Sequence, residues 1–146
     1  MTLFVLLSVI NVVVIGLICS YTDIKSGKIY NKVIESGCLA GLLILALFYG
    51  RGVDSSYFYE ALINSSIAVA FGYALWFCKK WSAGDAKLFS FLASFMPLCF
   101  YQNWYVKFFP SLNILVNSFI VVMLFMLYNF FVYIVKYCRA RSILTA

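Results

Sequence analysis

The sequence predicts an all-α protein that crosses a membrane several times as a helical bundle. Its 146 residues are 65% hydrophobic and only 11% charged, whereas soluble domains are roughly 45–50% apolar and about 25% charged. The apolar residues form long uncharged runs, and about 20 such residues cross the hydrocarbon core of a bilayer as a helix. Length and composition therefore predict one polytopic membrane domain over residues 1–146, with about five transmembrane helices.

The first predicted helix is an uncharged run of twenty residues, 2–21. No basic residue precedes this run, and the run is longer than the usual apolar core of a signal peptide. We therefore expect a transmembrane helix that is retained in the protein.

Four further uncharged runs predict the remaining helices. They are residues 36–50, 61–78, 88–106 and 108–135, with lengths of 15, 18, 19 and 28 residues. The shortest run must take its first turn from residues 31–35 to reach across the bilayer. The longest would extend about 42 Å at ~1.5 Å per residue, so its helix should begin after Pro110 or lie tilted. Pro97 lies inside the fourth run and should kink that helix.

The loops show a charge asymmetry that predicts how the bundle is oriented. Cytoplasmic loops of membrane proteins carry an excess of Lys and Arg. Only Arg51 and Lys107 fall on one side of the predicted bundle. The other side carries Lys25, Lys28, Lys32, Lys79, Lys80, Lys87, Lys136, Arg139 and Arg141. We therefore expect an outer N-terminus, a cytoplasmic C-terminus and a location in the cytoplasmic (inner) membrane.

Several classes of function find no support in the composition. The basic residues are scattered between apolar runs and form no basic face, so nucleic-acid binding is not expected. The chain has five widely spaced cysteines and no histidine, so we expect no metal site and no cofactor, and we assign no disulfide. No predicted loop exceeds roughly a dozen residues, so no separate soluble domain is expected.

Two of the five acidic residues, Asp23 and Asp85, lie at the edges of apolar runs on the predicted cytoplasmic side. An acidic residue in such a place is a candidate functional residue, because charge is costly near the bilayer. Each also has a structural explanation. Asp23 follows the last turn of the first predicted helix and could accept backbone N–H bonds in a turn before Gly27. The spacing Ser82-x-x-Asp85 matches a capping box at the start of a helix.

As a pair, the two aspartates favour a catalytic interpretation. Both lie at the same end of a small bundle, where helix ends can converge. Two carboxyl groups held close together cannot both ionise easily, so one keeps a proton while the other draws a proton from water. That water would attack a peptide carbonyl, and the protonated partner would supply a proton to the carbonyl oxygen or the leaving amine. Asp23 and Asp85 are therefore candidate catalytic residues.

The segments around both aspartates resemble the type IV prepilin peptidase family, membrane aspartic proteases whose second motif is G-x-G-D-x-K. The first motif is matched by Asp23, Ile29 and Asn31. The second motif is matched by Gly84, Asp85, Lys87 and Leu88. The resemblance covers most of the chain through the fourth predicted helix. It implies that Asp23 and Asp85 are catalytic and that Asn31, Gly84 and Lys87 support them.

The resemblance also implies a substrate, because members of this family remove a short basic leader from prepilins on the cytoplasmic face of the membrane. The small size is most similar to the peptidases of tight-adherence (Flp) pilus systems, with archaeal preflagellin peptidases as the alternative. Long members carry a cytoplasmic insert with cysteine pairs and methylate the product. This chain has no such insert, so no methyltransferase domain is expected. Prepilins or pseudopilins and the lipid bilayer are therefore the expected partners.

Three features depart from the family pattern. Ser82 replaces the first glycine of the second motif, and Tyr30 replaces a proline that is common before the asparagine. Five helices are predicted where six are often found. A serine at position 82 can still cap a helix and tolerate a tight turn, so Ser82 is kept among the supporting residues.

Two other functions remain open from the sequence. A non-enzymatic transport or channel subunit would use membrane carboxylates to bind ions or protons, although both aspartates fall at the same membrane end. A scaffold in a secretion assembly would use its aromatic-rich helices as binding faces and its aspartates as caps. The sequence leaves the oligomeric state open as well.

Overall fold

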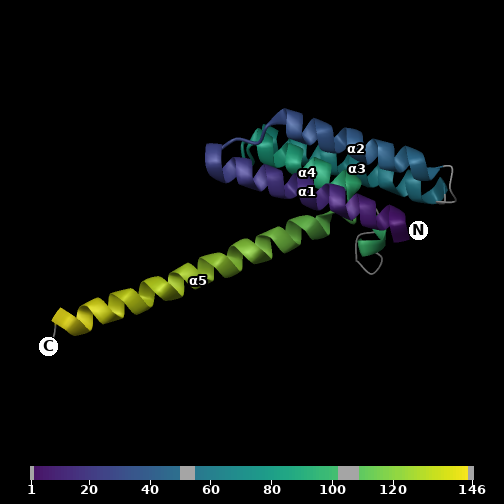
Figure 1. The fold of residues 1–146 in the computed structure, drawn as a ribbon. Helices are drawn as coiled ribbons and strands as arrows, with labels where there is room; N and C mark the ends of the chain where they lie inside the picture. The colour runs from purple at the N-terminus through teal and green to yellow at the C-terminus, as the bar shows by residue number, and fades with distance from the viewer. Residues whose placement is uncertain (1, 50–54, 102–108, 145–146) are drawn as a thin grey trace. The chain divides into compact units, whose positions relative to one another are not determined.

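The protein is described here by a computed structural model that covers residues 2–49, 55–101 and 109–144. The described part is all-helical, as predicted (Figure 1). Its elements are α1 (Thr2–Ser26), α2 (Asn31–Tyr49), α3 (Ser55–Phe77), α4 (Ala83–Phe95), the 3-10 helix η1 (Leu98–Tyr101) and α5 (Leu112–Leu144). Helices α1, α2 and α3 and residues 112–137 of α5 are each long and apolar enough to cross a membrane. The chain is therefore an integral membrane protein.

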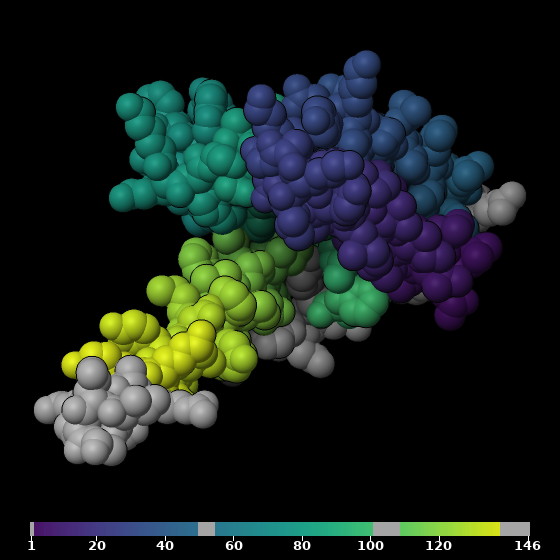
Figure 2. Space-filling model, turned by 60° about the vertical axis from the view of Figure 1, so that its left-hand side comes forward, coloured from purple at the N-terminus to yellow at the C-terminus, as the bar shows by residue number. Residues whose placement is uncertain are grey.

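The chain forms two compact units, Met1–Ser111 and Leu112–Ala146. The first unit is a bundle in which α3 packs on α4, α1 packs on α2, and α4 also contacts both α1 and α2. Figure 2 shows the side chains of α1 and α2 lying against each other along one face of this unit. The second unit is the unbroken helix α5 of 33 residues, which begins just after Pro110, as predicted.

The fourth helix is shorter than predicted, and the predicted kink at Pro97 is wrong. Helix α4 has 13 residues and ends at Phe95. A residue that precedes a proline is driven out of the helical region, and Met96 accordingly has φ −69° and ψ 126°. At ~1.5 Å per residue α4 is about 20 Å long, which is less than the ~30 Å hydrocarbon core of a bilayer. Residues 102–106 of the predicted span lie outside the described residues.

Glycines on one face of α2 allow α4 to pack closely against it. A Cβ atom at Gly37 would lie 2.7 Å from Cγ1 of Ile15 and 2.8 Å from the ring of Phe91. A Cβ atom at Gly41 would overlap the ring of Phe95. Small residues four positions apart are typical of close helix contacts in membranes. The absence of these two side chains therefore sets how near α4 lies to α2.

A buried polar network holds the far end of α4, where Pro97 ends the helix. Asn64 of α3 is 1% exposed, and its side-chain amide donates to the carbonyl oxygen of Ala93 at 2.9 Å. Its Oδ1 atom accepts from the backbone N–H of Ser111 at 3.2 Å and from the Ser111 hydroxyl at 2.8 Å. The last carbonyls of a helix lack partners within it, so Asn64 satisfies one of them from a neighbouring helix.

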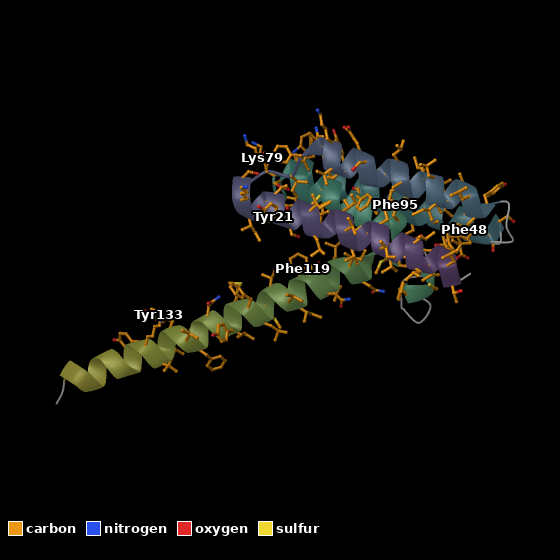
Figure 3. The ribbon with its side chains drawn as sticks, in the orientation of Figure 1. Tyr21, Phe48, Lys79, Phe95, Phe119 and Tyr133 are labelled. Atoms are coloured by element: carbon orange, nitrogen blue, oxygen red, sulfur yellow. The ribbon has the colours of Figure 1, made fainter. Side chains whose placement is uncertain are left out.

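Four helix ends gather at one end of the first unit, which we call the motif end and define as residues 22–34 and 76–87. Helices α1 and α3 finish there, and α2 and α4 begin there (Figure 1). Tyr21 and Lys79 lie at this end of the bundle, whereas Phe48 lies at the opposite end (Figure 3). The up-and-down order of the helices thus brings both candidate aspartates to the same end.

Candidate active site

Asp23 lies within the last turn of α1, and its predicted place after that helix is wrong. The helix continues to Ser26, whose hydroxyl donates to the carbonyl oxygen of Thr22 at 2.6 Å. It ends because Gly27 takes a φ of 62°, a left-handed conformation that glycine adopts without steric cost. The N–H of Gly27 donates to the backbone carbonyl oxygen of Asp23 at 2.7 Å. The position of Asp23 is therefore set by the helix end that Gly27 makes.

The carboxylate of Asp23 is exposed and does not cap a turn. The sequence suggested that it accepts backbone N–H bonds in a turn before Gly27, but residues 24–26 belong to α1. Within residues 2–49, 55–101 and 109–144, no group donates a hydrogen bond to this carboxylate. It is therefore available to water or to a substrate.

Asp85 forms the predicted capping box with Ser82 at the start of α4. Ser82 is the N-cap residue, with φ −71° and ψ 157°, and its Oγ atom accepts from the N–H of Asp85 at 3.1 Å. In return, Oδ2 of Asp85 accepts from the Ser82 hydroxyl at 2.7 Å and from the Ser82 N–H at 3.3 Å. One carboxylate oxygen is thus held in place, while the other has no protein partner within the described part of the chain. The serine that departs from the family pattern orients the aspartate.

The two motif segments lie far apart in the sequence but contact each other at the motif end. The ammonium group of Lys87 donates to Oδ1 of Asn31 at 2.9 Å, across 56 positions of sequence. A Cβ atom at Gly84 would lie 3.3 Å from both Cβ and Cδ1 of Ile29. The loop after α1 therefore lies directly against the first turns of α4, and the side chain of Ile29 takes the space that Gly84 leaves.

The structure thus brings together all the predicted site residues except one. Ser82, Gly84, Asp85 and Lys87 lie in or next to the first turns of α4, and Asn31 is joined to them through Lys87. Asp23 lies at the same end of the bundle but outside these contacts. Within the described residues, the Asp23 carboxylate has no hydrogen-bond partner, and the Asp85 carboxylate has one oxygen held by Ser82.

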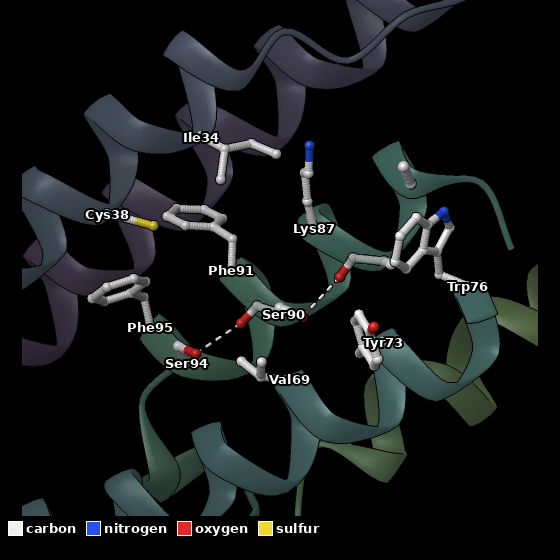
Figure 4. Close-up of a pocket in the computed structure, with 12 residues that line it drawn as sticks. Ile34, Cys38, Val69, Tyr73, Trp76, Lys87, Ser90, Phe91, Ser94 and Phe95 are labelled. Atoms are coloured by element: carbon white, nitrogen blue, oxygen red, sulfur yellow. Dashed lines mark hydrogen bonds between the residues drawn. The ribbon is translucent and has the colours of Figure 1, made fainter.

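An apolar groove of about 490 Å³ lies between α2, α3 and α4 and reaches the motif end (Figure 4). Ala83, Ala86 and Lys87, which flank Asp85 along α4, all line it. The hydroxyls of Ser90 and Ser94 also line it, but they donate to the carbonyl oxygens of Ala86 and Ser90 at 2.8 Å each, as the dashed lines show. Their hydrogens are therefore already used within α4.

This groove was not predicted, although the sequence holds a signal for it. Ala86, Ser90 and Ser94 recur every four residues and so share one face of α4. A face of small residues on a membrane helix is typical of a place that another group approaches closely. The aromatic and aliphatic residues that complete the groove come from α2 and α3, and no local pattern connects them to that face.

Comparison with known proteins supports the family resemblance that the two motifs indicated. Residues 10–136 match the type IV leader peptidase family. The chain is also similar to the prepilin peptidase EppA of Methanothermobacter thermautotrophicus, with 31% identity over 145 residues. This alignment covers 87% of the chain but 36% of the relative, so the chain spans about a third of the length of that protein. No solved structure matches the chain.

Proposed function

Because the chain belongs to the type IV leader peptidase family, we propose that it is a membrane aspartic endopeptidase that removes the leader peptide from type IV prepilins or pseudopilins. Asp23 and Asp85 activate the attacking water in this proposal. The substrates are Flp-like prepilins, and residues 1–146 act as one peptidase domain. The active site faces the cytoplasm from the inner membrane, as the excess of basic residues at the motif end favours.

The observation that carries this proposal is the contact between the two motif segments. Lys87 is joined to Asn31 at 2.9 Å, and Ile29 lies in the space that Gly84 leaves. Contacts of this kind hold the loop that follows Asp23 against the helix turn that carries Asp85. A shared site requires such a connection between the two segments.

The proposed chemistry uses the two carboxyl groups as an acid and a base. One carboxylate takes a proton from the water that attacks the scissile carbonyl, and the protonated partner gives a proton to the leaving amine. Ser82 supports this chemistry by holding Oδ2 of Asp85, which leaves the second oxygen of that carboxylate to face water. Asn31 and Lys87 act as positioning residues, because their hydrogen bond holds the two segments together.

The proposal is tested by co-expressing a candidate prepilin with the wild-type chain, Asp23→Asn or Asp85→Asn and following leader removal by the mass of the product. Positioned acid or base groups typically contribute 10²–10⁴-fold to rate, so we expect each variant to lose activity by about that factor at unchanged membrane levels. Glu60→Gln is the matched control, because Glu60 is an exposed acid on α3 outside both motifs. Wild-type cleavage by either Asn variant would refute the paired mechanism.

Substrate class is tested separately by offering the wild-type chain a Flp-type prepilin and an archaeal preflagellin in parallel. We expect faster cleavage of the Flp-type substrate. Faster cleavage of the preflagellin would leave the proposed peptidase activity and its two aspartates in place. It would replace Flp-like prepilins by preflagellins as the proposed substrates.

A further inference from the structure

The groove beside α4 differs in character between its two ends (Figure 4). Val69, Phe91 and Phe95 line the end away from the motif end, where Ser94 is the polar neighbour and its hydroxyl is bonded within α4. Trp76 and Lys87 line the end that reaches the motif end, and Lys87 is the only charged residue among the described residues that line the groove. The lining thus has the polarity of an amphiphile, with one cationic end and one apolar end.

The cation at the mouth of the groove is held by a neutral group. The ammonium group of Lys87 donates to the neutral amide oxygen of Asn31, and it forms no ion pair within the described parts of the chain. The motif end as a whole carries an excess of positive charge, with six lysines against the two carboxylates of Asp23 and Asp85. Trp76, 44% exposed, has the amphipathic ring that is typical of the membrane interface. The mouth therefore suits an anionic head group.

The apolar lining of the groove limits what can lie in it. Its lining on α4 runs from Ala83 to Phe95, about 18 Å at ~1.5 Å per residue. The space along that length is about 490 Å³. An extended peptide would leave most of its amide groups without partners there, because the lining is largely apolar and the hydroxyl hydrogens of Ser90 and Ser94 are already donated within α4. An acyl chain carries no such groups.

We propose that this groove binds one anionic phospholipid of the surrounding membrane. One acyl chain lies along Phe91 and Phe95, and the phosphate lies at Lys87 beside Trp76. Basic pockets between membrane helices on the cytoplasmic side are known to hold anionic head groups. This site does not depend on the proposed peptidase activity.

Quenching of Trp76 fluorescence by brominated lipids tests the proposal in the full chain. The chain has three tryptophans, so Trp81→Phe and Trp104→Phe leave Trp76 as the single reporter. This parent protein is reconstituted in phosphatidylcholine vesicles that contain a small fraction of brominated phosphatidylglycerol or of brominated phosphatidylcholine. One lysine near the surface favours an anionic lipid by about five-fold, so we expect the phosphatidylglycerol to bind with roughly five-fold higher apparent affinity.

Two variants in this parent separate the site from general surface charge. Lys87→Met should bring the ratio of the two apparent affinities, phosphatidylglycerol over phosphatidylcholine, close to one. Lys32→Met should leave this ratio unchanged, because Lys32 is an exposed lysine of α2 at the same end that does not line the groove. Ser94→Phe should fill the groove and weaken quenching by both lipids, with helicity checked by circular dichroism. Equal quenching in the parent, or a preference that survives Lys87→Met, would overturn the proposal. So would protection of Trp76 from both lipids by an added prepilin peptide, which would make the groove a peptide site.

Discussion

Replacing Gly37 by alanine tests whether the glycine face of α2 holds α4 in place. The new methyl group would lie 2.7 Å from Cγ1 of Ile15 and 2.8 and 2.9 Å from two ring carbons of Phe91, whereas ordinary carbon contacts are about 3.5–4.0 Å. Ile15 is 7% exposed and Phe91 is 2% exposed, so both are enclosed and cannot move aside freely. The substitution therefore forces extra volume into a closed contact.

The size of the effect follows from two opposing terms. Overpacking of a core costs about 1–3 kcal/mol, and alanine gains about 1 kcal/mol over glycine inside a helix. The net expectation for Gly37→Ala is a loss of about 1 kcal/mol in the free energy of unfolding. Gly16→Ala is the matched control, because a Cβ atom at Gly16 of α1 would meet nothing within 4 Å. It should show only the gain, so the two variants should differ by about 2 kcal/mol.

The measurement is reversible unfolding in mixed micelles by a denaturing detergent, followed by circular dichroism. The midpoint should fall for Gly37→Ala and rise for Gly16→Ala. If Gly37→Ala proved as stable as Gly16→Ala, the close contact between α2 and α4 at Gly37 would not exist in the membrane protein.

Two further substitutions test the ends of α4. Ser82→Ala removes the N-cap and should cost about 1 kcal/mol in unfolding free energy, whereas Ser82→Gly should cost only a few tenths; equal losses for the two variants in the same unfolding assay would contradict the capping role. Asn64→Leu removes the side-chain partner of the Ala93 carbonyl and of the Ser111 N–H, so it should lower the free energy of unfolding by about 1–3 kcal/mol. A neutral Asn64→Leu would show that this network does not hold the helix end.

Local patterns account for the parts of the fold that the sequence predicted well. The capping box at Ser82 and Asp85 was predicted from four adjacent residues, and the start of α2 at Asn31 followed from the length a span needs. The start of α5 after Pro110 was predicted because the last uncharged run is longer than a span needs. Each of these features depends on neighbours in the chain.

Two predictions were wrong because the end of an uncharged run does not indicate where a helix ends. The run that contains Pro97 predicted a long span, yet the backbone restriction that the proline imposes on Met96 ends α4 one residue earlier, at Phe95. Asp23 was expected after α1, yet that helix continues to Ser26, where the left-handed Gly27 ends it. In both cases backbone geometry at one residue overrode the hydropathy of the run.

The sequence by itself determined that this protein is helical, lies in a membrane and carries two aspartates in paired motifs, because composition, run length and short spacings are local properties. Only the tertiary structure decided that Lys87 reaches Asn31, that Phe91 fills the space at Gly37, and that a groove with one cationic end lies beside α4. These features join residues from three or four helices. They depend on how side chains of different helices pack together, and no pattern along a single helix records that.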